Sequence, residues 1–292
     1  MTAKTIQTSE IKQYLQQCGY QDSCLQEPYA YFAEDRKHVI DLAGFARETF
    51  NSESACIGFT NAVNISENKI KEHVLSYREL GAPVILVTHG SGLQFWKYQQ
   101  GDAVWSETIQ YKQMSNFFGT YRDQFNPEEI LRAKTIGRAN RNYQQLSFVD
   151  YGLMPLIEEK EGKYLSRIIT RSIDALSKYS KLDPTIDVNA RWLIQAAFWL
   201  IGAKILKDKG VDGFKLLDLA DISSLIDKVR RHYNAESPLS ATTAQKNALK
   251  KVADEIVKPI SSLSHVTINS LSYVYENTLV TPTTRKALGT HA

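Results

Sequence analysis

Over about the first 120 residues the spacing of hydrophobic positions changes repeatedly, which indicates a mixed α/β domain. Ile11 and Leu15 recur at helical spacing, as do Ile70 and Val74, and Gly81 stands where the second helix would end. Short apolar runs separated by turn residues indicate strands. The predicted order is one helix, three strands, a second helix and a hairpin of two strands: residues 8–19, 29–33, 38–43, 54–60, 70–81, 84–87 and 93–98.

From Phe125 onward the hydrophobic positions follow a helical period. Asn126-Pro127-Glu128-Glu129 is a helix start signal, because Asn caps, Pro suits the first turn and acids favour the positive end of the helix dipole. Further helices are predicted over 163–176, 192–203, 214–233 and 249–256, and Pro259 should kink or end the last of them. The pattern therefore predicts an α+β chain with an α/β domain over residues 1–120 and a helical domain over residues 121–292.

Composition narrows the class of protein without naming a function. With 43% hydrophobic and 23% charged residues the 292-residue chain can bury a core, and a net charge of +3 is far from that of a histone-like protein. The most apolar run, 192–203, is too short to span a bilayer. Three cysteines without a CxxC pair, and an N-terminus without an apolar signal segment, favour a reducing cytoplasm and predict no membrane partner.

Asp41 is the one candidate for metal chemistry. It precedes the apolar strand 54–60, and this order is similar to the core of divalent-metal nucleases of the PD-(D/E)xK type. In those enzymes an Asp on one strand and a Glu-x-Lys on the next hold magnesium. The run Ala55–Phe59 contains neither an acid nor a lysine, so the favoured interpretation is a degenerate, non-catalytic scaffold. An active site completed by Lys69 or Lys71 from the next helix is the alternative.

Basic residues form two clusters with two interpretations each. One set follows the Asn126 start signal and the other ends a predicted helix. They are phosphate contacts, or they are solvated helix faces whose cations favour the negative end of the helix dipole. The clusters comprise Arg132, Lys134, Arg138 and Arg141 in the first, and Lys228, Arg230, Arg231 and His232 in the second.

Five segments, taken in order, resemble a known family. They read SACIGF, LGAPVILVT, QLSFVDYGLMP, WLIGAKILKDKGV and YENTLVTPTTRKALGTHA. Together they resemble the region that precedes the catalytic domain in N-6 adenine DNA methylases of restriction-modification type. The last segment is the most specific, and in that family it leads directly into the S-adenosylmethionine domain. The chain is therefore expected to stop at a domain boundary of a longer enzyme.

The resemblance implies an accessory role for these 292 residues. They contain no glycine-rich S-adenosylmethionine loop and no Asn-Pro-Pro-Tyr or Asp-Pro-Pro-Tyr motif, so no catalytic residue and no cofactor is assigned. S-adenosylmethionine is implied only for the full-length protein. The implied partners are duplex DNA and other restriction-modification subunits. The candidate DNA contacts are Lys134, Arg138, Arg141, Lys228, Arg230, Arg231, Arg285 and Lys286.

Two other functions stay open from the sequence. The first is a magnesium-dependent nuclease fused to a modification enzyme, with Asp41 as a ligand. The second is a structural module that docks a specificity subunit.

Overall fold

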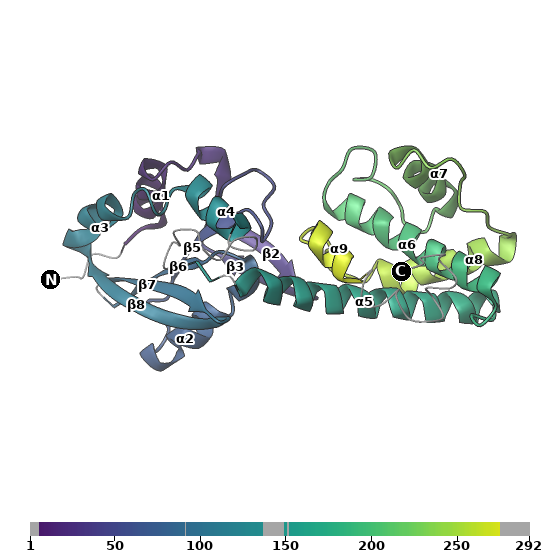
Figure 1. Cartoon of the computed structure of the whole chain (residues 1–292), viewed down its shortest axis with the longest axis horizontal. Coiled ribbons are helices and arrows are strands. Elements are labelled where there is room, and N and C mark those ends of the chain that lie inside the picture. Colours follow the sequence, from purple (N-terminus) through teal and green to yellow (C-terminus); the bar gives the residue numbers. More distant parts are fainter. Residues whose placement is uncertain (1–5, 91, 137–148, 151, 275–292) are drawn as a thin grey trace. The chain divides into compact units, whose positions relative to one another are not determined.

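The computed structural model describes residues 6–90, 92–136, 149–150 and 152–274. The chain divides into two compact units (Figure 1). The first holds residues 1–33 and 37–157, and the second holds residues 34–36 and 158–292. The change in hydrophobic spacing predicts a domain boundary near residue 120, whereas in the structure residues 121–157 group with the first unit. Phe125 and Ile130 explain this, because both are fully buried in a core that the sheet shares.

A six-stranded mixed sheet forms the centre of the first unit, in the order β1-β4-β5-β6-β7-β8. β5 and β6 are parallel, and the other neighbouring pairs are antiparallel. β2 and β3 form a separate two-stranded sheet. The strands are β1 Leu25–Gln26, β2 Tyr29–Ala33, β3 Arg36–Ile40, β4 Leu42–Phe45, β5 Ala55–Asn61, β6 Val84–His89, β7 Gly92–Gln99 and β8 Asp102–Gln110.

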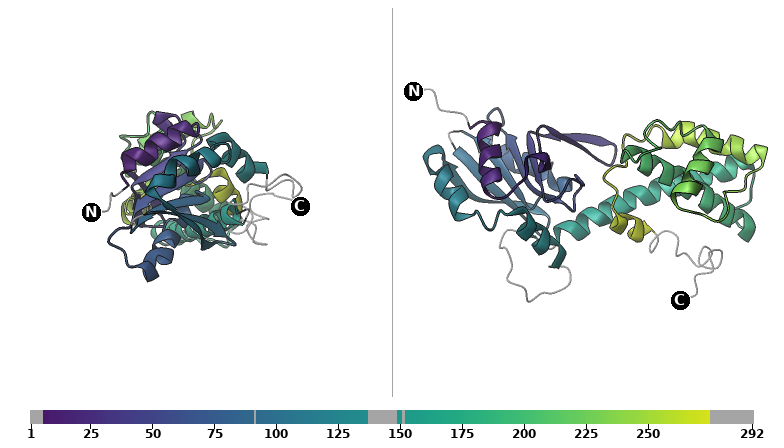
Figure 2. Two further views of the ribbon diagram at one scale, coloured as in Figure 1. Left: turned by 90° about the vertical axis from the view of Figure 1, so that its left-hand side faces the viewer. Right: turned by 90° about the horizontal axis from the view of Figure 1, so that it is seen from above.

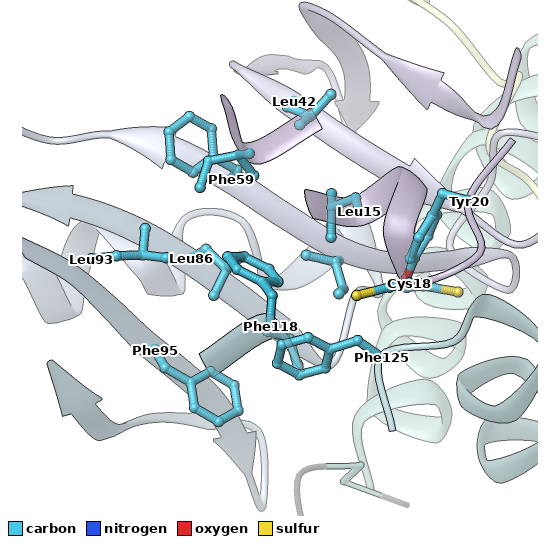
Figure 3. Close-up of a cluster of buried hydrophobic side chains, with 14 of the residues drawn as sticks. Leu15, Cys18, Tyr20, Leu42, Phe59, Leu86, Leu93, Phe95, Phe118 and Phe125 are labelled. Atoms are coloured by element: carbon cyan, nitrogen blue, oxygen red, sulfur yellow. The ribbon is translucent and has the colours of Figure 1, made fainter. Parts of the chain in front are cut away.

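Helices cover both faces of the large sheet. α1 (Thr8–Gln17), α3 (Met114–Thr120) and α4 (Pro127–Ile136) lie on one face, and α2 (Glu67–Leu75) lies on the other (Figure 1). Because side chains alternate along a strand, β6 serves both cores. Its Leu86 packs under α1 and α3 with Phe59, Phe95, Phe118 and Phe125 (Figure 3), while Ile85 and Val87 pack under α2.

The second unit is helical. Its helices are α5 (Leu153–Ser180), whose first residues pack in the first unit, α6 (Asp187–Asp208), α7 (Ile222–His232), α8 (Thr243–Val252) and α9 (Ile268–Val274). Figure 2 shows α6, α7 and α8 gathered around the C-terminal half of α5. α6 is apolar on most of its circumference and supplies the centre of this core, from Leu193 to Leu206. No helix among the described residues is long and apolar enough to cross a membrane.

Several predicted elements are present with shifted ends. The predicted strand 38–43 is two strands, because the chain turns at Asp41 between β3 and β4. Asn126 caps α4 as expected, and its Oδ1 accepts the Glu128 N–H at 3.0 Å. Gly81 ends the segment after α2 with φ +78°, a conformation that glycine adopts most easily. The strand β8 was not predicted, because most of its residues are polar and the alternation of apolar and polar positions is weak.

The single helix predicted over 214–233 is wrong in its first part. The helix begins only at Ile222, where Asp221 caps it by accepting the Ser224 N–H at 3.1 Å. Just before it, Asp218 accepts the Ala220 N–H at 3.0 Å in a local turn. These short acidic side chains bond the backbone and so compete with the helix. Leu216, which lies inside the predicted helix, is 98% exposed.

Candidate nucleic-acid interface

Asp41 lies at the turn between β3 and β4, and its carboxylate binds the backbone. Its Oδ2 accepts the Asn61 N–H at 2.7 Å, which holds the end of β5 beside the start of β4. His73 of α2 lies near this carboxylate and contacts Thr60 Oγ1 through Nε2 at 3.3 Å. Burial lowers the pKa of His73, and the charge of Asp41 partly offsets the shift.

A magnesium site needs more ligands than Asp41 supplies. Among the residues that the structure describes, no three His, Cys, Asp or Glu side chains come together as a metal-binding group. Lys71, one of the two lysines that could complete a nuclease site, forms an ion pair with Asp102 at 2.7 Å. Lys69 lines an open groove that also includes His73. The visible role of Asp41 is therefore to join two strand ends.

The first basic cluster separates into buried and exposed members. Lys134 is 7% exposed, and its Nζ donates to the carbonyl oxygens of Ser52 and Ala55, each at 2.7 Å. Arg132 is exposed and pairs with Glu129 at 3.0 Å. The burial of Lys134 removes it from any surface that could contact DNA. Four of the candidate DNA contacts lie outside the described residues: Arg138, Arg141, Arg285 and Lys286.

The second basic cluster lies at the C-terminal end of α7. Lys228 donates to the carbonyl oxygen of Gly213. Arg230 and Arg231 share the carboxylate of Asp227, at 3.7 Å and 2.7 Å, and the Arg231 side chain is 72% exposed. One acid thus pairs with one half-buried and one exposed guanidinium group, so the cations at this end of α7 outnumber their acid partner.

A longer basic surface follows α5 and was not singled out in the sequence. Lys163, Arg167, Arg171 and Lys178 are all exposed and recur at spacings of four, four and seven residues. At 3.6 residues per turn these positions fall within about 80° of one helix face. We call these four residues the α5 cationic stripe. The opposite face carries the fully buried Leu165, Ile169 and Leu176.

The charges of the stripe are only partly neutralised. Lys163 pairs with Glu159 at 2.6 Å, and Arg167 pairs with Glu34 at 3.1 Å. Within the described part of the chain, Arg171 and Lys178 have no ion pair or hydrogen bond through their side chains. Asp174 is an acid on the same helix face.

A neighbouring helix adds charge beside the end of the stripe. Lys251 of α8 lies with its Nζ 5.2 Å from the ring centre of Tyr179, the residue after Lys178. The same ring donates its hydroxyl to Glu255 at 2.5 Å, so an acid accompanies this extra cation. The spacing that defines the stripe is readable in the sequence, but the hydrophobic pattern predicts only a helix over 163–176 there and does not single out its cations.

No protein family, curated protein or solved structure matches the chain. The resemblance to adenine methylases therefore has no independent support. Function is inferred from the charges and contacts of the chain itself.

Proposed function

We propose that this chain is a non-catalytic, DNA-binding portion of an adenine-specific DNA methyltransferase of restriction-modification type. The observation that carries the proposal is the α5 cationic stripe on the second unit. The methyltransferase assignment comes from the sequence resemblance, and S-adenosylmethionine belongs to the catalytic domain that this resemblance implies elsewhere in the protein.

The length of the stripe suits a duplex backbone. Lys163 and Lys178 are fifteen residues apart, which corresponds to about 22 Å along the helix at 1.5 Å per residue. DNA carries about one negative charge per 1.7 Å of its axis, so several phosphates lie within reach of one such face. A rigid helix holds these cations in a fixed row, and among the described residues Arg171 and Lys178 have no ion pair to break before they bind.

Contacts of this kind position a protein on DNA without reading its sequence. A methylase must also flip its target base out of the stack, which costs a few kcal/mol. A helical unit that binds the phosphate backbone of the DNA would offset that cost. We therefore expect binding that depends strongly on salt and weakly on DNA sequence.

The test is fluorescence anisotropy with a labelled duplex of about 20 base pairs over a range of salt concentrations. The double variant Arg171→Gln with Lys178→Gln removes the two stripe cations that form no ion pair with the residues that the structure describes. We expect weaker binding at low salt and a slope of log K against log salt that is smaller by about 2.

A matched control removes the same charge from the first unit. Arg47→Gln with Lys112→Gln changes two exposed cations that belong to other segments than α5, and it should leave the salt slope unchanged. Equal effects of the two double variants would show that net charge alone governs binding. Absence of binding to any duplex at low salt would contradict the proposal and favour a docking module.

A further inference from the structure

The second unit contains a pocket of about 360 Å³ beside the stripe. The turn Glu34–Arg36 groups with this unit and contributes to the lining. The pocket combines an excess of positive charge with apolar surface, because its lining includes three arginines against two acids, together with three isoleucines: Arg36, Arg167, Arg171, Glu34, Asp35, Ile168, Ile256 and Ile260. A volume above about 300 Å³ is enough for a small organic ligand.

The two acids of the pocket are already engaged. Glu34 accepts a hydrogen bond from Arg167 at 3.1 Å, and Asp35 accepts one from the hydroxyl of Tyr164 at 2.7 Å. Arg36 and Arg171, in contrast, make no ion pair or hydrogen bond with the described residues. The pocket therefore presents two guanidinium groups whose donors are available to a ligand.

Arg167 and Arg171 lie close enough together for their positive charges to repel each other. Residues four apart on a helix are neighbours, and two like charges there repel each other. Glu34 offsets the charge of Arg167 only. An anion bound near Arg171 and Arg36 would relieve the remaining repulsion.

We infer that this pocket binds a phosphate monoester with a flat, weakly polar body, such as a mononucleotide. A guanidinium group presents paired N–H donors that match two phosphate oxygens. The isoleucines offer apolar surface for the body of the ligand, which free phosphate would leave unused. The inference goes beyond the proposed function, because a pocket for one nucleotide does not require a duplex on the stripe.

The first measurement is isothermal titration of the full chain with AMP, adenosine and inorganic phosphate. AMP should bind. Adenosine lacks the phosphate that the arginines would bind, and inorganic phosphate lacks the nucleoside that the isoleucines would contact, so each should bind at least about tenfold more weakly than AMP. Equal binding of AMP and inorganic phosphate would overturn the apolar part of the inference. No saturable binding of AMP at millimolar concentration would overturn all of it.

Matched variants locate the site. Arg36→Gln and Arg171→Gln should each weaken AMP binding by about tenfold, because each removes a charge-assisted contact. Lys178→Gln belongs to the stripe but does not line the pocket, so it should leave AMP binding unchanged. If Lys178→Gln weakens AMP binding as much as Arg171→Gln does, the ligand is held by general surface charge and the pocket is not its site.

Two further measurements distinguish a DNA strand end from a free nucleotide as the ligand, and distinguish the pocket inference from the proposed function. A duplex with a 5′-phosphate should displace AMP better than the 5′-hydroxyl duplex if the natural ligand is a strand end, and equally if it is a free nucleotide. Lys178→Gln should weaken duplex binding without affecting AMP. If the wild-type chain binds AMP but no duplex, the proposed function alone is contradicted. If it binds duplex but not AMP, the pocket inference alone is contradicted.

Discussion

Lys204 and Asp208, one turn apart on α6, form a buried ion pair with Nζ and Oδ1 2.8 Å apart. Their side chains are only 8% and 10% exposed. The second oxygen, Oδ2, accepts the backbone N–H of Leu263 at 2.7 Å. The pair therefore ties the end of α6 to the segment before α9, and it supplies a partner for a buried backbone donor.

Breaking this pair should destabilise the second unit strongly. Lys204→Met leaves Asp208 buried without its cation, and we expect a loss of about 3 to 5 kcal/mol in the free energy of unfolding. The double variant Lys204→Met with Asp208→Leu removes both charges and should lose less, although Leu263 N–H then lacks its acceptor at a cost of about 1 to 3 kcal/mol. Urea denaturation followed by circular dichroism measures both. A double variant that is less stable than the single one would contradict this account.

Lys134 is expected to act in folding rather than in DNA binding. Its Nζ bonds two carbonyl oxygens of the segment before and at the start of β5, and a charged donor of this kind contributes about 1.5 to 3 kcal/mol per bond. Lys134→Met should therefore lower the free energy of unfolding by at least about 2 kcal/mol. Arg132→Gln, an exposed cation on the same helix, should change it by less than about 0.5 kcal/mol. Similar losses from both variants would refute the distinction.

His265 should make the stability of the second unit depend on pH. Burial, aided by the charge of Lys209, lowers the pKa of His265 to about 4, and its Nδ1 is buried with no hydrogen bond among the described residues. The unfolded chain takes up this proton near pH 6.5, before the folded chain does. The contribution of neutral His265 to the free energy of unfolding is therefore fully present above pH 6.5. It decreases by up to about 3 kcal/mol as the pH drops toward 4.

Urea denaturation at several pH values tests this prediction. His265→Gln removes the titrating group, so the decrease between pH 6.5 and 4 should become shallower than in the wild type. Unchanged pH dependence in the variant would assign the effect to other groups. Nuclear magnetic resonance titration of the His265 ring would measure the lowered pKa directly.

Local patterns predicted much of the fold. β2 begins and ends where its apolar run does, and α4 begins at Pro127 because Asn126 and the following acids act within a single turn. Longer elements were harder to place. The segment 214–221 has helical hydrophobic spacing, yet acidic caps at Asp218 and Asp221 bond the backbone first.

The candidate interface shows the same limit more clearly. Lys134 and Arg171 both stand on amphipathic helices and are equivalent as basic residues in the sequence. Lys134 is enclosed because α4 packs on the sheet beside the carbonyl groups of Ser52 and Ala55, which are far from it along the chain. Arg171 stays exposed because α5 buries its opposite face.

By itself the sequence determined what depends on neighbours within a few residues: the helical and strand periods, the start of α4 at Pro127, and the spacing of cations along α5. Only the tertiary structure decided which charges face solvent, where the chain divides, and that Arg36 joins Arg167 and Arg171 around one pocket. The physical reason is distance along the chain. Burial and charge pairing arise between segments that no local pattern connects.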